Sequence, residues 1–555
     1  MESRQRPYAD PPVRRHAGRG NRLREGVLLL TLSIPSVYVF LTLPPLWRDT
    51  DAFNEVASAF APRGIIHFLP GYCLGGRLII FAGSIVASLL GGRGIPYLSI
   101  SNTPLTDAGV YTLIVAQHLF LVLSLFYAVK TLSDHFPMRA LFAVVFALTP
   151  WLYIYANCIG TEAFSNPLVY LIAACGWNCL RTAELNRRKI FVYFGLLLAA
   201  ALTRHINALL AAGLAIALLP LAGKELIRRS AATNLTNGKS RYRSTRRLLI
   251  FMVVGLSAIG TSVLVQQTMC WLFRVPFRST FGETLSYRLS YLEVLPEQER
   301  TAILGRISAK LADPVVTEAF DALNRSLNQG ENWTNTFLYD KMDEILMRSG
   351  LQEMQSRTFQ IDLKLNRIAT CVLLSGESNF LEVVWTSFVL SPFFSQTDLA
   401  SPPFELTDWL QSQLHYPRYE RLRRLTSFQH EQGYYGAVWK QIPYVHLFER
   451  IPMLEMACLT IALAIVLGGL ALVGISGDPV TEAGAWYAIS MIVVGLLVSL
   501  AICLSTYFQA RLYLPVYSLF QLGMLLAVSL AANTLLERLE GFKNRVNRSA
   551  TVVRF

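Results

Sequence analysis

The sequence is poor in charged residues. Only 16% of its 555 residues are Asp, Glu, Lys or Arg, whereas 53% are hydrophobic and the mean hydropathy is +0.39. A soluble domain carries about 25% charged residues. The scarcity of charge therefore excludes an ordinary soluble protein and predicts an all-α protein that crosses a membrane several times.

Other patterns are missing as well. The eight cysteines form no Cys-x-x-Cys pair and no Cys/His spacing suited to a metal, and no internal repeat is found. The net charge of +13 lies in short basic segments between apolar stretches, which argues against nucleic acid as a partner. Seven arginines precede the first apolar span and no small-residue cleavage site follows it, so we expect an uncleaved anchor with a cytoplasmic N-terminus.

The apolar stretches predict about ten spans, because a helix needs about 20 apolar residues to cross a bilayer. The expected spans are 27–46, 109–130, 140–156, 162–180, two arms within 190–221, 248–270, 453–473, 485–505 and 512–536. The basic segments between them should face the cytoplasm, and so should both termini. We therefore expect a multi-pass protein of the cell envelope, in a bacterial inner membrane.

Three apolar stretches need a separate interpretation. Stretches 73–92 and 368–394 contain charged residues, and counting either as a span would place the basic loops outside. We expect the first to lie in the outer interface and the second to be interfacial or buried. Stretch 190–221 is interrupted at Arg204, and a single helix of that length would run about 48 Å. It predicts a hairpin that breaks at Arg204 within the outer leaflet.

This layout divides the chain into five parts. We expect a cytoplasmic basic tail (1–26), a transmembrane module with a first outer loop at 47–108 (27–270), an extracytoplasmic region (271–450), the last transmembrane helices (451–536) and a cytoplasmic tail (537–555). The extracytoplasmic region matches no pattern that we can name, and we expect it to select an acceptor.

An acidic stretch follows the first span directly. Asp49, Asp51 and Glu55 lie within one step of the membrane surface, next to Arg48. One or two anchoring residues would suffice to end a span, so three carboxylates suggest chemistry. The alternative is an interfacial loop that happens to be acidic, because so short a pattern recurs by chance.

The Arg48-Asp49 and Asp49-Thr50-Asp51 patterns resemble the first outer loop of the GT-C glycosyltransferases, such as protein mannosyltransferases and aminoarabinose transferases. These membrane enzymes take a sugar from a polyprenyl phosphate. The resemblance implies a GT-C-like fold and an inverting transfer to an acceptor on the extracytoplasmic side. It also implies that Asp49 is the base, with Asp51 raising its pKa or orienting the acceptor. Aminoarabinose transferases have Glu directly after that Asp, whereas Thr50 stands here.

The resemblance also implies which groups hold the donor. Leu202-Thr203-Arg204 is similar to the Leu-Thr-Arg that ends a short span in these enzymes, and Arg511 precedes a Tyr and a Pro as in their last span. Both arginines are candidate phosphate ligands, since a guanidinium grips phosphate oxygens in pairs. The alternatives are a snorkelling helix end at Arg204 and an interfacial Arg/Tyr belt around Arg511.

Three further residues are weaker site candidates. Glu162 could contact the donor sugar or the acceptor, or could simply complement the helix dipole behind a Thr161 cap. His205 and Tyr513 neighbour the two arginines and complete the set. The implied partners are a polyprenyl-phosphate sugar, a glycan, lipid or protein acceptor and membrane lipids. No cofactor is required, and no pattern indicates a divalent cation.

Other functions stay open. A lipid-linked glycan ligase or polymerase also has many spans and a large outer loop with essential Arg and His, and it could use His415, Arg418, Arg421 and His446. The acidic stretch favours the transferase, because a ligase needs no base there. A transporter would show internal repeats and charges near mid-membrane. A non-catalytic assembly protein would leave the acidic stretch and the arginines without a purpose.

Overall fold

The chain was analysed as a computed structural model. It describes residues 19–47, 56, 69–92, 104–182, 186–216, 218–220, 223, 238–272, 274, 282, 286–330, 334–375, 377–390, 420–428, 479–505 and 510–552. Within these ranges the chain is almost entirely helical, and the single sheet found there has two strands of two residues each. The expected all-α class is confirmed.

The N-terminal bundle runs from α1 to η1. Its elements are α1 (Arg19–Thr42), β1 (Leu46–Trp47), α4 (Pro70–Leu90), α5 (Asp107–Leu132), α6 (Phe136–Ala147), α7 (Pro150–Ala156), β2 (Cys158–Ile159), α8 (Glu162–Arg181), α9 (Arg187–Thr203) and the 3₁₀ helix η1 (His205–Ala211). The long helix α11 (Gly238–Leu272) follows.

The second half holds a group of shorter helices and two long helices. η2 (Tyr287–Val294) leads into α13 (Glu297–Leu311), α14 (Pro314–Asn328), α15 (Thr334–Arg348) and α16 (Met354–Ser375). We call α13–α16 the four-helix unit. After it come α17 (Ser378–Leu390), α20 (Glu420–Arg423), α24 (Pro479–Ser505), η6 (Ala510–Tyr513) and α25 (Leu514–Val552).

Six described helices are long and apolar enough to cross a membrane. They cover Asn21–Thr42, Pro70–Leu90, Asp107–Leu132, Arg246–Leu272, Val480–Leu504 and Leu514–Leu539. α6 and α7 would form a seventh span, bent by 62° where Pro150 starts α7. The chain is thus a multi-pass membrane protein. The expected number of about ten is not reached among the described residues, and 453–473 lies outside them.

Two features of the structure account for the smaller number of candidate spans. The stretch 162–180 forms helix α8 but carries Glu162, Asn166 and Asn178, so it is not apolar enough to count. The stretch 190–221 is split as predicted, because α9 ends at Thr203 and Arg204 is extended with φ −148° and ψ 137° before η1 begins. The predicted break at Arg204 is therefore confirmed.

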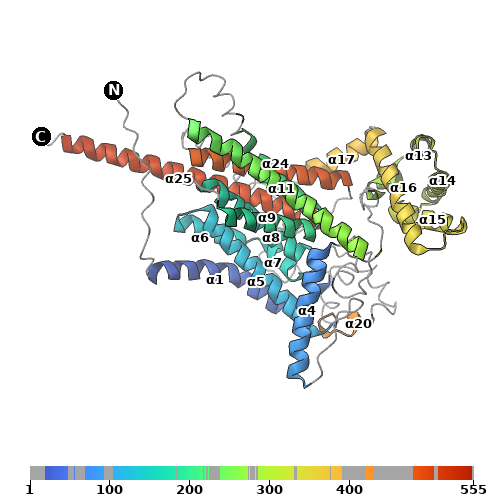
Figure 1. Cartoon of the computed structure of the whole chain (residues 1–555), viewed down its shortest axis with the longest axis horizontal. Coiled ribbons are helices and arrows are strands. Elements are labelled where there is room, and N and C mark those ends of the chain that lie inside the picture. Colours follow the sequence, from blue (N-terminus) through green and yellow to red (C-terminus); the bar gives the residue numbers. More distant parts are fainter. Residues whose placement is uncertain are drawn as a thin grey trace.

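α4 differs from the other long helices in direction. In Figure 1 it runs at a steep angle to the directions of α1, α24 and α25, and it packs against the first turns of α5. A Cβ on Gly109 would lie 2.5 Å from the Ile80 carbonyl oxygen, so only glycine permits this approach. The composition of α4 suits a membrane span. The expectation that 73–92 lies in the outer interface stays a prediction.

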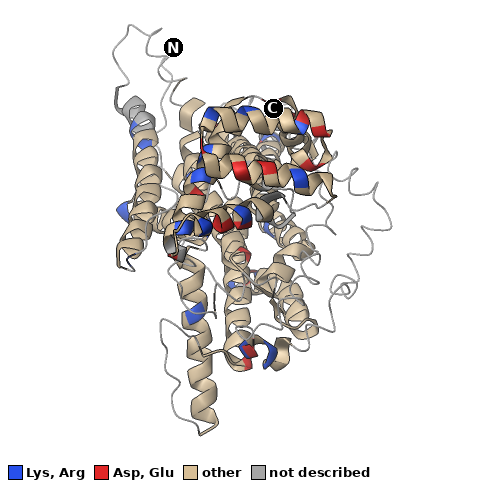
Figure 2. Cartoon of the chain, turned by 90° about the vertical axis from the view of Figure 1, so that its right-hand side faces the viewer, with Lys and Arg blue, Asp and Glu red and all other residues tan. Residues whose placement is uncertain are grey.

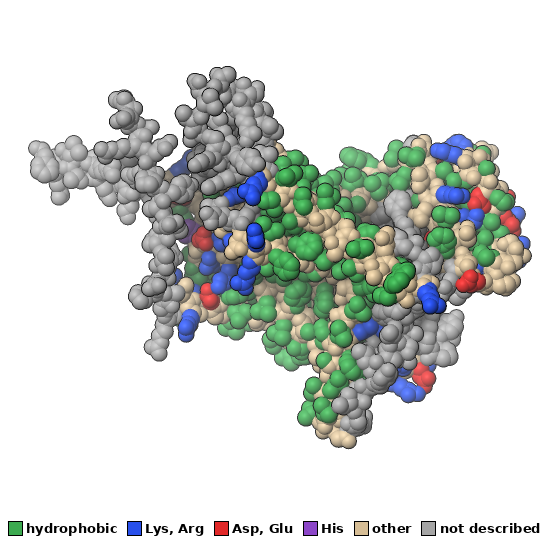
Figure 3. All heavy atoms as spheres, in the orientation of Figure 1, with side chains coloured by type: hydrophobic (Ala, Val, Ile, Leu, Met, Phe, Trp, Pro, Cys, Tyr) green, Lys and Arg blue, Asp and Glu red, His purple; other side chains and the backbone are tan. Residues whose placement is uncertain are grey.

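The surface matches a membrane protein. Figure 3 shows hydrophobic side chains over the middle of the molecule, with the described charged residues gathered towards its two ends. α1 begins and α25 ends on the left of Figure 1, whereas the four-helix unit lies on the right. Figure 2, which faces that right-hand end, shows acidic and basic residues spread over the helices nearest the viewer.

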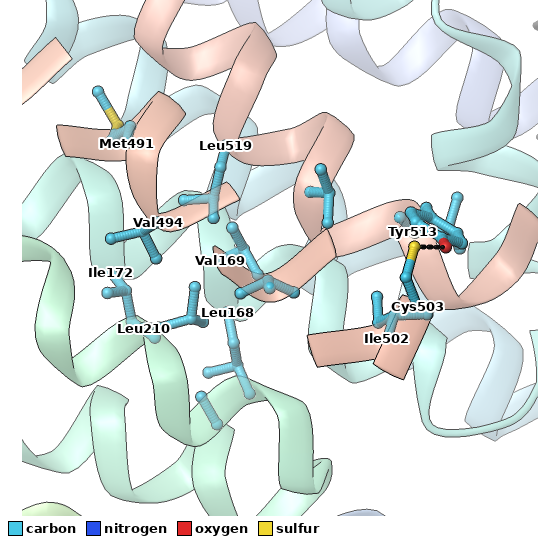
Figure 4. Packing of buried hydrophobic residues seen from close by; sticks show 14 of the residues in the cluster. Leu168, Val169, Ile172, Leu210, Met491, Val494, Ile502, Cys503, Tyr513 and Leu519 are labelled. Atoms are coloured by element: carbon cyan, nitrogen blue, oxygen red, sulfur yellow. Dashed lines mark hydrogen bonds between the residues drawn. The ribbon is translucent and has the colours of Figure 1, made fainter. Parts of the chain in front are cut away.

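The core of the bundle joins both halves of the chain. Figure 4 shows α8, η1, α24 and α25 meeting through side chains that are all apolar: Leu168, Val169, Ile172, Leu210, Met491, Val494 and Leu519. Tyr487 on α24 donates to the Ala173 carbonyl at 2.9 Å, and Tyr170 on α8 donates to Gln521 on α25 at 2.6 Å. These bonds fix the depth of α24 and α25 against α8.

Candidate functional site

The end of the first span is fastened to the turn before α8. β1 and β2 pair in parallel, with Leu46 opposite Cys158 and Trp47 opposite Ile159. Asn157 strengthens this join, because its side-chain amide donates to the Pro44 carbonyl at 2.7 Å and its own carbonyl accepts from the Leu46 amide at 3.0 Å. The chain therefore enters the acidic stretch from a fixed position.

A buried network of polar side chains supports the pairing of β1 with β2. Gln117 of α5 donates to the carbonyls of Ala156 and Cys158, both at 2.9 Å, and accepts from the Tyr72 hydroxyl of α4 at 3.0 Å. The same hydroxyl accepts from the Gly160 amide at 2.9 Å. Because buried polar groups are costly unless they are bonded, each of these contacts fixes the turn more firmly.

His118 adds a second link from α5. Its Nδ1 lies 2.7 Å from the Ser36 hydroxyl of α1, and its Nε2 lies 3.3 Å from the Asn157 side-chain oxygen. His118 thus ties α1, α5 and the turn together in one buried chain of polar groups. The sequence gives little sign of this role, since His118 and Gln117 are isolated polar residues in an apolar span.

The acidic residues themselves are not placed. Arg48, Asp49, Asp51 and Glu55 lie outside the described residues, so their assigned roles stay predictions. Trp47, the residue directly before them, is fully buried and pairs with Ile159, three positions before Glu162. Trp47, the last described residue before the acidic stretch, therefore lies close to the first turn of α8.

Glu162 and Arg204 form a buried ion pair at this place. Nη2 of Arg204 lies 3.6 Å from Oε1 of Glu162, and the two side chains are 11% and 2% exposed. Thr161 makes no side-chain capping bond, so the expected Thr161 cap is wrong. Burial of two charges is tolerated when they are paired, and Glu162 therefore holds Arg204 at the break between α9 and η1.

The break that carries Arg204 is supported by neutral polar groups. Asn207 of η1 donates to the Ser165 hydroxyl at 3.0 Å and to the Ala200 carbonyl at 3.1 Å, and the same carbonyl also accepts from the Arg204 backbone amide at 3.1 Å. Gly71 at the start of α4 touches the last turn of α9, where a Cβ would lie 2.7 Å from the Leu202 oxygen. Four elements thus converge on Arg204.

One more polar side chain lies one helical turn from Glu162. Asn166 is 2% exposed, and neither atom of its side-chain amide has a hydrogen-bond partner among the residues that the structure describes. Residues four apart share a face of a helix, so Asn166 and Glu162 are neighbours on α8. His205, in contrast, is exposed at the start of η1.

The segment 420–428 packs against the region around Trp47 and the start of α5. The backbone amides of Thr426 and Ser427 donate to the Asp107 carboxylate at 3.1 and 2.8 Å. Leu422 and Phe428 join a buried cluster that includes Trp47. A segment far along the chain therefore packs against the anchor of the acidic stretch.

The last span supplies a further group. Tyr513 is fully buried, and its hydroxyl lies 2.9 Å from Sγ of Cys503, as Figure 4 shows. Burial raises the pKa of Tyr513, so the phenol stays neutral. Arg511 lies in the same turn of 3₁₀ helix, but its side chain is outside the described part. Tyr513 therefore acts as a packing residue of this turn.

The ends of α8 and α25 lie at the same depth. The bond from Tyr170 to Gln521 joins positions eight residues after Glu162 and after Tyr513, and the two helices run in the same direction from there, since Trp177 and Leu530 both lie beside Gly484. Eight residues of helix span about 12 Å in each case. The ion pair of Glu162 and Arg204 and the turn of Arg511 are thus at the same end of the bundle.

Sequence reasoning missed one buried cation at that end. Arg288 of η2 is 4% exposed and lies beside Cys503 and Tyr513. Its only signal in the sequence is an arginine between Tyr287 and Leu289, which is too common a pattern to single out. Among the described residues, no group of three or more His, Cys, Asp or Glu side chains is arranged to hold a metal.

Comparison with protein-family models, with curated proteins and with solved structures found no match to this chain.

Proposed function

We propose that the protein is an inverting glycosyltransferase of the GT-C type, which moves a sugar from a polyprenyl phosphate to an acceptor outside the membrane. One observation carries the proposal: the pairing of Trp47 with Ile159, which starts the acidic stretch beside the Glu162–Arg204 pair. Asp49 is two residues beyond Trp47, and two residues of extended chain reach about 7 Å. The proposal therefore expects the Asp49 carboxylate and the Arg204 guanidinium to lie within one substrate's length of each other.

The residues divide the reaction between them. Asp49 accepts the proton of the acceptor hydroxyl, whose oxygen attacks the anomeric carbon. The bond from that carbon to the phosphate oxygen breaks, and polyprenyl phosphate leaves with the electron pair. Arg204 and Arg511 balance the charge that grows on the phosphate. Asp51 orients the acceptor or raises the pKa of Asp49.

Glu162 fits this scheme as a positioning residue for Arg204. A guanidinium that is held in place before the substrate arrives loses less entropy when it binds a phosphate. Asn166, one turn further along α8, is placed to contact the sugar or the acceptor. The neighbouring segment 420–428 is the part of the extramembrane region best placed to select that acceptor.

The proposal includes a location and an orientation. The enzyme lies in the inner membrane of a bacterial cell envelope, with both termini in the cytoplasm and the four-helix unit outside. α4 lies in the outer interface, and its steep direction relative to α1, α24 and α25 supports this placement. The transfer needs no cofactor.

The experiment is mass spectrometry of polyprenyl-phosphate sugars and surface glycans in a deletion strain. We expect one lipid-linked sugar to accumulate and the same sugar to disappear from a surface glycan. Complementation with the wild-type gene should reverse both changes, whereas Asp49→Asn should not. Asp321→Asn, an exposed carboxylate of α14, is the matched control and should complement. Unchanged lipid-linked sugars in the deletion strain would refute the proposal.

A lipid-linked glycan ligase is the second candidate, because of Arg421. This residue of α20 lies in the segment that packs against the Trp47 cluster, and burial lowers the pKa of its guanidinium. His415, Arg418 and His446 lie outside the described residues. A ligase predicts that whole glycans, not single sugars, accumulate on the lipid, and that Arg421→Met blocks transfer while Asp49→Asn does not.

A further inference from the structure

Arg288 lies at the junction of the extramembrane part with the last two spans. Its side chain is 4% exposed, and its Nη1 donates to the Ser387 hydroxyl of α17 at 3.1 Å. The ionisable groups that act on it are Cys503 and Tyr513, which face one another in Figure 4. No carboxylate is among these neighbours in the described part of the chain.

The depth of this position is that of lipid headgroups. Cys503 lies at the end of the candidate span Val480–Leu504, and Tyr513 directly precedes the span Leu514–Leu539. Phosphate groups of membrane lipids lie where the apolar part of a span ends. A buried arginine at this depth can therefore reach the phosphate group of a membrane lipid.

The geometry of the guanidinium leaves one edge for such an anion. Nε and Nη2 are buried and have no hydrogen-bond partner among the described residues, whereas Nη1 is held by Ser387. Nε and Nη2 lie on the same edge of the planar group, and together they match two oxygens of a phosphate. A buried cation without an anion is unfavourable, so a bound phosphate would stabilise the folded protein.

We infer that Arg288 binds the phosphate group of a membrane lipid, with Ser387 positioning its guanidinium. The inference does not depend on the proposed glycosyl transfer. The lipid is either a polyprenyl phosphate or an anionic phospholipid, which share the phosphate that the Nε–Nη2 edge recognises.

The test measures lipid binding to the full-length protein in dodecyl maltoside micelles, because this detergent carries no phosphate. The probes are farnesyl phosphate and phosphatidylglycerol, with farnesol as the uncharged control. Arg288→Met should weaken binding of one of the two phosphate lipids about 10–100-fold, the usual effect of losing hydrogen bonds to a charged group. Arg288→Lys and Ser387→Ala should weaken it less, because each keeps part of the interaction. Arg348→Met, an exposed arginine of α15, should change nothing.

Thermal unfolding separates a binding role from a packing role. Without a phosphate lipid, Arg288→Met should unfold at a temperature no lower than wild type, because a buried unpaired charge has been removed. The bound lipid should raise the unfolding temperature of wild type but not that of the variant. If Arg288→Met does not fold, the unfolding temperatures of Arg288→Lys and Ser387→Ala are compared with and without the lipid instead.

The outcomes are distinct. Loss of farnesyl phosphate binding assigns the site to a polyprenyl phosphate, and loss of phosphatidylglycerol binding assigns it to a phospholipid. Wild-type affinity for both in all three variants would overturn the inference. Asp49→Asn should bind both lipids normally, so a failed base assignment leaves this result unaffected.

Discussion

The N-terminal bundle and the four-helix unit place their polar side chains in opposite ways. In the bundle, Leu30 and Leu41 are 63% and 74% exposed while Gln117 and Asn157 are fully buried. In the four-helix unit, Phe320 is 1% exposed and most charged side chains lie on the surface, although Arg300, Arg357 and Asp362 are buried. The bundle faces hydrocarbon, which offers no hydrogen bonds, so its polar groups must find partners inside. The unit faces water and buries its apolar face instead.

One charged pair from each region shows a contrast in burial. Arg204 and Glu162 are almost fully buried in the bundle, whereas Arg348 and Glu318 of the four-helix unit are 54% and 47% exposed at a distance of 2.6 Å. A shorter distance does not make the second pair the more important one. Solvent screens exposed charges, so geometry alone says little about the energy of a pair.

The largest expected effect is a difference in labelling. Asp134→Cys, in the exposed turn between α5 and α6, and Gln329→Cys, in the exposed turn after α14, should be labelled from opposite sides of the membrane. An impermeant thiol reagent on intact cells should reach only Gln329→Cys. The seven described native cysteines are all buried, so wild type is the background control. Labelling of both from one side would contradict the proposed topology, in which the four-helix unit is outside and the turn between α5 and α6 is cytoplasmic.

A second prediction concerns the two ion pairs. Arg204→Ala should lower the free energy of unfolding by about 3–5 kcal/mol, because it leaves Glu162 buried and uncompensated. Arg348→Ala should change it far less, since its pair is exposed and screened by solvent. Reversible unfolding in mixed micelles would measure both.

A double variant tests whether the loss of stability comes from the unpaired charge. Glu162→Gln combined with Arg204→Met should recover much of the loss, because no unpaired charge remains. Equal losses for Arg204→Ala and Arg348→Ala would contradict the contrast between a buried and an exposed pair.

The smallest expected effect is a pH dependence confined to the four-helix unit. Burial alone raises the pKa of Asp313, but the Lys364 ammonium and the amides of Val315 and Val316 outweigh it and lower the pKa below its usual 3.8. The folded unit then holds fewer protons than the unfolded chain. The ionised Asp313 carboxylate therefore stabilises the folded unit. This contribution to the free energy of unfolding is complete above pH 3.8 and is lost as the pH falls through the lower pKa of the folded state.

Hydrogen exchange of α13–α16 against pH would measure this contribution. Lys364→Met should flatten the loss of protection at low pH, whereas Lys310→Met, an exposed lysine of α13, should leave it as in wild type. An unchanged pH profile for Lys364→Met would show that the Asp313 carboxylate is not held by that lysine.

Several features could be predicted from the sequence because they follow from local composition. Apolar stretches of about 20 residues have to become helices in a bilayer, which is why 27–46, 109–130, 485–505 and 512–536 all correspond to candidate spans. The break at Arg204 was predictable for the same reason, since a guanidinium interrupts an apolar run at a cost that a helix end can avoid. The bend between α6 and α7 was not predicted, although Pro150 marks its position.

The sequence by itself determined the class of the protein, its long apolar helices and the candidate cations at Arg204 and Arg511. Only the tertiary structure decided which of these groups meet. The pairing of Trp47 with Ile159, the buried pair of Glu162 with Arg204 and the position of Arg288 join segments far apart in the chain. Hydropathy depends on neighbours in sequence, whereas a buried polar contact depends on partners brought together by packing, and no local pattern encodes that distance.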